Sequence, residues 1–196
     1  MNRNYNTFFL WSALVLCLVF SSTQVYSQFE QKLTVNMSGS FVYPDMLEEF
    51  TSYGNGLGLD GGLQFNINRT VSFYGSARFY YMFGLSDYSD AYYSNIAFGG
   101  GLKLNILPTK KINPYAFAEA NLNFIWLDEY NYETSYYNDE FGTSIGGLGG
   151  LGIDFKLNDN IALFIQSGAY FTFWDKRINL YSQAGLRINM IKSKTI

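Results

Sequence analysis

The chain has 196 residues, of which 48% are hydrophobic, 19% aromatic and 15% charged; it carries no His, one Cys and a formal net charge of −3. So apolar a composition excludes intrinsic disorder, and a single Cys excludes a disulfide scaffold. The lack of His removes triads with a His base, His-containing zinc sites and histidine proton switches. The negative net charge gives no basic footprint for nucleic acid.

The N-terminal segment has the pattern of a secretory signal peptide. Residues 8–20 form an apolar run of thirteen residues, which is shorter than the about 20 residues that a membrane-spanning helix needs. Val25 and Ser27 stand at the −3 and −1 positions of a small-residue cleavage site. The alternative, a buried N-terminal helix, lacks caps and amphipathic spacing. We therefore predict a signal peptide over residues 1–27 and one exported domain over residues 28–196.

The only cysteine, Cys17, lies inside this predicted signal peptide. Lipid attachment needs a small residue directly before the Cys, whereas Leu16 precedes it and the apolar run continues to Phe20. A lipoprotein is therefore disfavoured. The exported domain must be stabilised by hydrogen bonds and apolar burial, without disulfides.

Eight segments of the remaining chain alternate apolar and polar residues with the period of a β-strand, and none shows helical spacing. A period of two predicts strands with two unlike faces. The segments are residues 33–41, 57–67, 71–83, 96–106, 116–126, 145–157, 161–173 and 178–190.

Short and long connections alternate between these segments. Tight turns are expected at residues 68–70 and 158–160 and a modest one at residues 107–113. Long loops are expected at residues 44–55, 84–94 and 128–142, and a brief one at residues 174–177. Short turns at one end and long loops at the other are typical of transmembrane up-and-down barrels, which have an even number of strands.

Alternation alone does not fix which face points inward, because a soluble ligand barrel would carry its apolar stripe inside. Here the polar face consists mostly of Gly, Ser, Asn, Gln, Tyr and Ala, which suits a narrow lumen better than a solvated wall. Aromatic residues such as Phe83, Trp126 and Phe171 gather at the long-loop ends, where an interfacial belt is expected. We predict an all-β, eight-stranded antiparallel transmembrane barrel, with Leu163 facing lipid near the bilayer midplane.

The last segment resembles the C-terminal insertion signal of a known family. Residues 183–190, QAGLRINM, have a polar residue, a Gly and then alternating apolar positions. Over residues 28–196 the chain resembles the small eight-stranded OmpA/OmpX-type outer-membrane barrels. It departs from their commonest form because residues 191–196 follow Met190 in place of a terminal Phe. The resemblance implies the outer membrane of a Gram-negative bacterium, with outer-membrane lipid and lipopolysaccharide as neighbours.

Charged residues at inward positions form a predicted lumen network. Symmetric hairpins would place Asp60 opposite Arg78 and Lys103 opposite Glu119. An isolated buried ion is costly, so these charges should pair across strands. A polar plug is one interpretation, and a selective or gated pore lined by the same residues is the other. The network comprises Asp60, Arg78, Lys103, Glu119, Asp154, Lys156 and Arg187.

The three long loops hold ten of the 16 acidic residues, interleaved with tyrosines. Tyrosine is a common anchor of recognition surfaces, so a binding surface for an extracellular partner is one interpretation. The other is a solvated surface that meets lipopolysaccharide through bridging divalent cations. No stretch has the spacing of a calcium loop, so we predict no metal site. The candidate surface comprises Asp87, Asp90, Asp128, Glu129, Tyr130, Tyr132 and Glu133.

The favoured function is structural or interactive, without catalysis and without a cofactor. Enzymes of this barrel class use a catalytic His, and the loop acids do not single out a carboxylate pair. The alternative is a narrow channel or carrier for small solutes, which would need an opening in the wall. Glycines at residues 99–101 and 146–152 permit such an opening, or relieve crowding in a small barrel. We expect a monomer that does not bind nucleic acid.

Overall fold

The computed structural model describes residues 33–43, 53–84, 89–131, 136–173 and 178–190, and these residues form eight β-strands. The predicted signal peptide, residues 1–27, lies outside them. The described residues contain no helix that is long and apolar enough to cross a membrane. The strands are β1 (Leu33–Tyr43), β2 (Tyr53–Asn66), β3 (Val71–Gly84), β4 (Ser89–Asn105), β5 (Ile112–Asn131), β6 (Tyr136–Lys156), β7 (Ile161–Thr172) and β8 (Ile178–Asn189).

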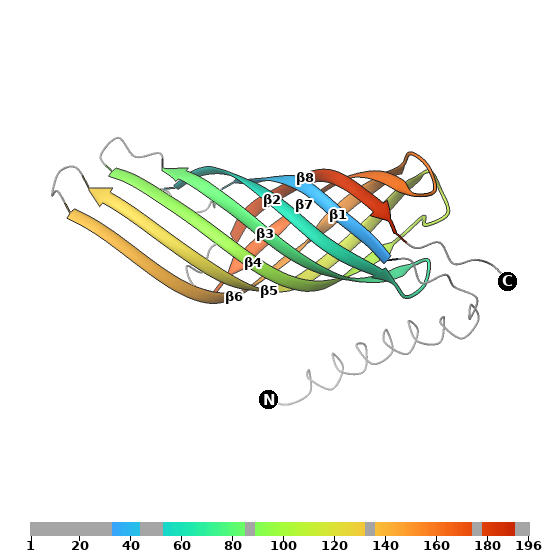
Figure 1. Cartoon of the computed structure of the whole chain (residues 1–196), viewed down its shortest axis with the longest axis horizontal. Coiled ribbons are helices and arrows are strands. Elements are labelled where there is room, and N and C mark those ends of the chain that lie inside the picture. Colours follow the sequence, from blue (N-terminus) through green and yellow to red (C-terminus); the bar gives the residue numbers. More distant parts are fainter. Residues whose placement is uncertain (1–32, 44–52, 85–88, 132–135, 174–177, 191–196) are drawn as a thin grey trace, which may run out of the picture. The chain divides into compact units, whose positions relative to one another are not determined.

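Each strand pairs antiparallel with its neighbours in the sequence, and β1 pairs with β8, so the sheet closes into a barrel (Figure 1). The predicted all-β, eight-stranded up-and-down barrel is therefore confirmed. Closure joins Thr34 to Asn189 and Tyr43 to Leu180, so the first and last strands pair over nearly their whole length.

The two short hairpins are stabilised by the same kind of hydrogen bond, from backbone N–H groups to an Asn side chain. In the β2–β3 turn, Asn68 Oδ1 accepts hydrogen bonds from the backbone N–H groups of Thr70 and Val71, at 2.8 and 2.7 Å. In the β6–β7 turn, Asn158 Oδ1 accepts from Asn160 and Ile161, at 2.8 and 2.9 Å. An Asn side chain that bonds its own backbone two residues on stabilises a tight turn. The turns predicted at residues 68–70 and 158–160 are confirmed.

The apolar face of the sheet points outward. Leu59, Ile145 and Leu151 are each more than 60% exposed, whereas the alternate positions are buried in the lumen. A continuous apolar surface of this extent is a membrane surface rather than a solvated one. The structure thus decides between the two orientations that alternation leaves open.

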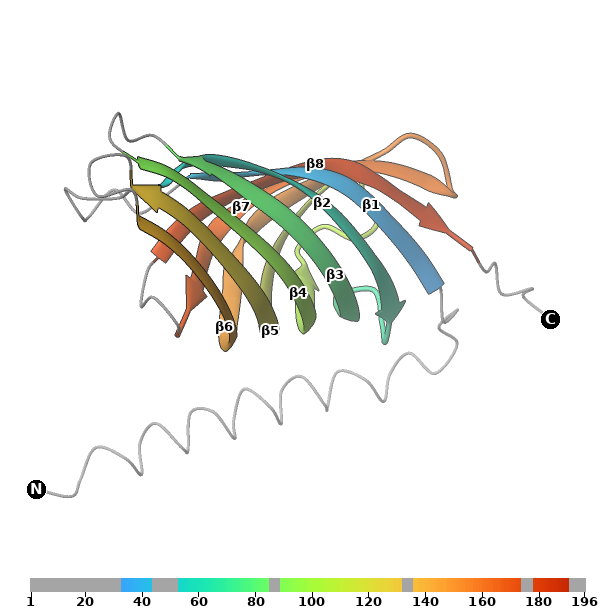
Figure 2. The ribbon, with the colours of Figure 1, turned by 60° about the vertical axis from the view of Figure 1, so that its left-hand side comes forward.

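Three strands are much longer than their apolar pattern predicts. β4 begins at Ser89, β5 continues to Asn131 and β6 begins at Tyr136, within the stretches expected to be loops. β4 and β5 pair continuously from Ser89↔Asn131 to the short-turn end. β5 and β6 pair continuously from Asn131↔Tyr136 to the same end. Tyr-rich segments favour strands, and they extend the sheet beyond the apolar band. Figures 1 and 2 show β4, β5 and β6 continuing past their neighbours at the end opposite the short turns.

The glycines in the wall relieve crowding. Gly150 pairs with Gly168 between β6 and β7, and a Cβ on Gly150 would lie 2.1 Å from the Ser167 backbone oxygen. The β6–β7 ladder runs without interruption from Gly146 to Lys156. Of the two interpretations of the glycine run, close packing is the one that this geometry supports.

Leu163 faces outward as predicted, with 43% of its surface exposed, but its predicted depth is wrong. It is the third residue of β7, close to the short-turn end, whereas Ile165 lies nearer the middle of the strand. Alternation fixes the face of a residue but not its depth, which depends on where the strand begins.

An arginine on the lipid face is most costly at the bilayer midplane and much less so near the interfaces. We expect Ile165→Arg to lower the free energy of unfolding in bilayers by roughly 2–4 kcal/mol, and Leu163→Arg to lower it by less. Urea titration of both variants folded in vesicles measures the difference. The absence of a cost in both variants would contradict the membrane orientation, and equal costs would contradict the difference in depth.

Candidate functional site

The middle of the lumen holds one arginine between two carboxylates. Arg78 on β3 donates from Nε to Asp60 Oδ1 at 2.6 Å, and its two terminal nitrogens lie 3.2 and 3.3 Å from the oxygens of Glu119. The Tyr181 hydroxyl donates to Asp60 Oδ1 at 2.6 Å. All three charged side chains are buried. A buried ion pair is tolerated when its geometry is good and additional hydrogen bonds satisfy it.

A second cluster, with the opposite composition, lies nearer the short turns. Asp154 on β6 accepts from Lys103 Nζ at 2.5 Å, and it also pairs with Arg187 on β8. Arg187 donates from Nη2 to the Tyr115 hydroxyl at 3.0 Å. Lys103 Nζ lies 4.0 Å from the centre of the Tyr115 ring, a cation–π distance. This cluster has two cations for one carboxylate, whereas the middle cluster has two carboxylates for one cation.

Of the two predicted cross-strand pairs, one is confirmed and one is wrong. Asp60 stands directly opposite Arg78. Lys103, however, stands opposite Phe117, while Glu119 stands opposite Gly101. The β4–β5 hairpin is centred one residue earlier than a symmetric turn about Lys111 would be. A shift of two positions keeps every residue on its predicted face but exchanges its partners.

Lys156, the seventh predicted member of the network, belongs to neither cluster. It is half-buried at the short-turn end, where its ammonium group donates to the Pro108 backbone oxygen. Its inward position was predicted correctly, but its partner here is the backbone of a turn rather than a carboxylate of either cluster.

A layer of amides and tyrosines that the charge-based prediction missed fills the lumen above the middle cluster. Asn95 Nδ2 donates to the hydroxyls of Tyr80 and Tyr170 at 2.7 and 3.0 Å, and to Asn123 Oδ1 at 3.1 Å. The Tyr170 hydroxyl also donates to Asn123. These residues stand at inward positions of the same alternation, so their parity is the signal that could have found them.

Above this layer the lumen turns apolar. Val42, Met82, Tyr93 and Ile125 are buried at the loop end and belong to one hydrophobic cluster with Tyr80 and Tyr170. An eight-stranded barrel is just wide enough for side chains to fill. The interior is therefore packed from the turns to the loop end.

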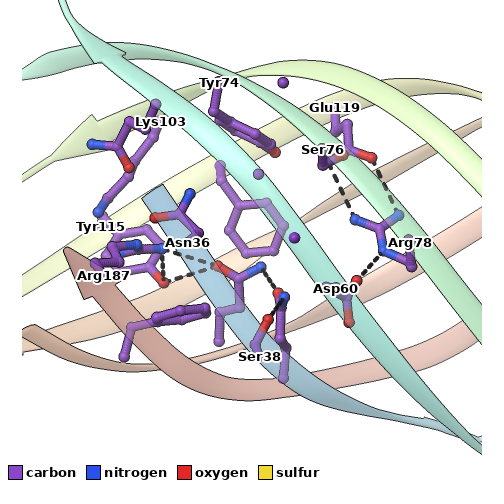
Figure 3. Close-up of a pocket in the computed structure, with 18 residues that line it drawn as sticks. Asn36, Ser38, Asp60, Tyr74, Ser76, Arg78, Lys103, Tyr115, Glu119 and Arg187 are labelled. Atoms are coloured by element: carbon purple, nitrogen blue, oxygen red, sulfur yellow. Dashed lines mark hydrogen bonds and ion pairs between the residues drawn. The ribbon is translucent and has the colours of Figure 1, made fainter. Parts of the chain in front are cut away.

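A cavity of about 40 Å³ lies in the lumen between the two charged clusters (Figure 3). Arg78, Asp60 and Glu119 lie on one side of it, and Lys103 and Arg187 on the other. Such a volume holds a few waters at most. It is too small for a solute of the size that ligand pockets bind.

Glycines on β4 make room for this network. A Cβ on Gly99 would lie 2.2 Å from Glu119 Oε1, and one on Gly101 would lie 2.7 Å from the Tyr74 ring. Any larger residue at position 99 would push Glu119 away from Arg78. Gly99 and Gly101, two of the three glycines at residues 99–101, therefore leave the space that Glu119 and Tyr74 occupy.

The predicted outer surface is only partly within the described residues. Asp87, Tyr132 and Glu133 lie outside them. Asp90 stands on β4, and Asp128, Glu129 and Tyr130 stand on β5, all in the strand extensions rather than in loops. The register places Asp128 opposite Asp139, and Glu140 opposite Leu127.

These extensions form what we call the projecting sheet: residues 89–92 of β4, 127–131 of β5 and 136–144 of β6. β3 pairs with β4 only as far as Met82↔Tyr93, and β7 pairs with β6 only from Thr172↔Gly146. Among the described residues, no strand pairs with residues 136–144 on the side away from β5. The β6 side of the projecting sheet is therefore an edge with no neighbouring strand among the described residues.

The described residues at the two ends of the barrel differ in charge. The described residues of the projecting sheet include Asp90, Asp128, Glu129, Asp139 and Glu140 and no Lys or Arg. In the described part of the chain, no three acidic residues come together as a metal site would require.

Solved structures with the same fold are outer-membrane barrels. The Neisserial surface protein A aligns with a TM-score of 0.60 and 16% identity, over 81% of this chain and 97% of that one. Ail, the attachment invasion locus protein of Yersinia pestis, aligns with a TM-score of 0.56 and 13% identity, over 83% and 100%. Ail has also been solved with the heparin analogue sucrose octasulfate, and that structure aligns at 0.51.

A major outer membrane protein from Thermus thermophilus aligns with a TM-score of 0.58 and 11% identity, over 83% of this chain and 100% of that one. No protein-family model and no curated relative matches the sequence. The likeness therefore shows the fold that the sequence resemblance implied.

Removing Arg78 leaves two buried carboxylates without their cation. We expect Arg78→Ala to lower the free energy of unfolding by about 3–5 kcal/mol, because breaking a buried pair costs more than the pair contributes. The exposed Lys110→Ala, a change of charge without burial, should stay within about 0.5 kcal/mol. Urea titration in vesicles compares them, and a mild effect of Arg78→Ala would show that the cluster is not a structural centre.

Proposed function

We propose that this chain is a non-enzymatic outer-membrane β-barrel protein of a Gram-negative bacterium, exported by the signal peptide at residues 1–27. In this proposal the filled barrel is a rigid anchor in outer-membrane lipid and lipopolysaccharide, and the projecting sheet binds an extracellular partner. The observation that carries it is a β6 edge that has no neighbouring strand among the described residues and lies above a lumen packed with side chains.

The edge of β6 offers backbone groups in a fixed direction. Phe173 N–H donates to the Ile145 backbone oxygen at 3.0 Å, so residues of that parity on β6 turn their backbone groups away from β5. Phe141 and Thr143 have the same parity and lie beyond the last β7 pair. An extended peptide adds to such an edge by main-chain hydrogen bonds, while alternate side chains supply specificity.

The charge of the projecting sheet favours a cationic partner. Five acidic residues without a described Lys or Arg create a negative potential that attracts positive segments and repels anionic ones. Ail was solved with a sulfated heparin analogue, a polyanion. An anion of that kind does not suit the acidic sheet of this chain, so the two proteins would differ in partner despite their common fold.

The lumen supports an anchoring role rather than transport. Two charged clusters, an amide and tyrosine layer and an apolar cluster follow one another along the axis, and the cavity between the charged clusters is only about 40 Å³. The buried acids already bind cations of the protein, so none is placed as a free catalytic carboxylate. The structural observations thus favour the plug over the alternative of a narrow channel.

We expect the refolded exported domain to give no steady single-channel currents in planar bilayers, because its lumen is filled. Arg78→Ala should also remain silent, since the layers above the cluster stay intact. Insertion is verified beforehand by protease protection in vesicles. Regular currents that change with the Arg78 substitution would favour the channel instead.

The edge proposal predicts binding of a cationic extended peptide. The probe is a synthetic peptide of alternating Thr and Lys, compared with the same peptide carrying Glu in place of Lys. Fluorescence anisotropy with the barrel in nanodiscs should detect the Lys peptide and not the Glu peptide. Thr143→Pro, which removes an N–H on the open edge and spares the ladder to β5, should weaken binding at least about tenfold.

Thr143→Val is the matched control, because it keeps both the N–H group and the shape of the side chain. It should bind the Lys peptide as the parent does. Equal binding by all three proteins would show that the acidic charge acts without the edge. Lack of binding to the parent would contradict the proposed recognition surface.

A further inference from the structure

The opposite end of the barrel carries a second surface, defined by its turns. The backbone N–H of Asn105 donates to the Thr70 oxygen at 2.7 Å, and its side chain donates to the Arg69 oxygen at 3.2 Å. These bonds fasten the β2–β3 turn to the β4–β5 turn. The position of Arg69 beside the next turn is therefore fixed by the backbone.

Hydrogen bonds also join the β4–β5 turn to β6. Lys156 donates from its backbone N–H to the Lys111 oxygen at 2.9 Å and from its side chain to the Pro108 oxygen. Lys110 closes the turn itself by donating from its backbone to Leu107 at 3.0 Å. Arg69, Lys110, Lys111 and Lys156 thus lie along one continuous arc, which we call the basic arc.

Cations outnumber carboxylates at this end of the barrel. The remaining short turn, residues 158–160, carries Asp159 and no cation. Directly inside the rim, Lys103 and Arg187 face the single carboxylate of Asp154. Counted over these turns, this cluster and Lys156 at the end of β6, the described residues hold six cations and two carboxylates. The low dielectric of the barrel wall strengthens the resulting positive potential at the rim.

The arc lies at the edge of the lipid-facing band. Ile67, Ile106 and Leu107 are exposed apolar residues directly before the polar turn residues, and Ile112 directly follows Lys111. Apolar side chains that remain exposed up to the turns carry the hydrocarbon boundary to this level. The exposed side chains just beyond it, at the depth of the lipid headgroups, are those of Arg69, Lys110 and Lys111.

We propose that the basic arc binds anionic phospholipid headgroups of the leaflet that faces the short turns. Long, exposed Lys and Arg side chains at a membrane boundary attract anionic lipid by charge, and each adds to the affinity. The arc covers the β2–β6 side of the rim, whereas the side that carries Asp159 stays free of such lipid. This proposal rests on the membrane placement proposed above but not on any partner of the projecting sheet.

The test measures lipid preference in the intact exported domain. The protein is refolded into vesicles of phosphatidylcholine containing a minor proportion of phosphatidylglycerol, extracted in mild detergent, and its retained lipids are counted by native mass spectrometry. The neutral variant is Arg69→Gln with Lys110→Gln and Lys111→Gln. The matched control keeps the charge: Arg69→Lys with Lys110→Arg and Lys111→Arg.

We expect the parent and the charge-keeping control to retain phosphatidylglycerol in preference to phosphatidylcholine, and high salt to abolish the preference. One cation near an anionic surface changes lipid affinity roughly fivefold. In the neutral variant, which lacks three cations, the preference for phosphatidylglycerol over phosphatidylcholine should therefore fall at least about tenfold. Free glycerophosphate should not compete at matched ionic strength, because the site requires a headgroup held in the membrane.

An unchanged preference in the neutral variant, or no preference in the parent, would overturn the basic arc. Competition by free glycerophosphate would assign the arc to soluble phosphate instead. Heat-dependent gel mobility in pure phosphatidylcholine vesicles reports insertion separately. If the parent itself fails to insert there, the membrane placement fails and the arc loses its basis.

Discussion

The constraint on which the structure depends is that a sheet in hydrocarbon must satisfy every backbone hydrogen bond within itself. Closure of β1 onto β8 achieves this, and it fixes the width of the lumen. With eight strands the inward side chains meet at the centre, so each inward residue must pack or pair with others from distant strands. The ion clusters, the small cavity and the glycines opposite Glu119 all follow from that narrow space.

The buried charges balance in number over the whole lumen but not within each cluster. Three cations and three carboxylates are buried in the two clusters, but Arg78 faces two acids while Asp154 faces two bases. The charge balance is therefore reached over the length of the lumen, and each cluster leaves a residual charge of opposite sign. The positive residual charge lies nearer the basic arc, and the negative one nearer the projecting sheet.

Residue parity explains what could be predicted from the sequence. A period of two determines the face of every residue, so the lumen residues Asp60, Arg78, Glu119 and Arg187 were found on their side of the wall. The turns at Asn68 and Asn158 were predictable from their own residues, because an Asn side chain that bonds its own backbone stabilises a tight turn. Partners need the register as well, and a hairpin centred one residue earlier exchanged the partner of Lys103 while leaving its face unchanged.

Residue parity does not predict the length of a strand. Alternation of apolar and polar residues reports only the part of a strand that faces lipid, and it stops where the outer face becomes polar. β5 continues through Asp128, Glu129 and Tyr130 because backbone pairing and tyrosine propensity do not depend on lipid. Leu163 was placed too deep for a related reason: a repeating pattern has no marker of its own midpoint.

The need to satisfy every backbone hydrogen bond within the sheet applies only inside the bilayer. From Gly146 to Lys156, β6 pairs with both β5 and β7, but towards the loop end β6 continues past β7, and among the described residues no strand pairs with residues 136–144 on that side. In hydrocarbon an unpaired edge would be prohibitive, whereas in water its N–H and C=O groups are solvated and available. The change of medium at the end of the barrel is therefore what permits an open edge there. Because the lumen is filled, the surfaces left for other molecules to meet are the outer wall and the two ends, whose described residues carry an excess of opposite charge.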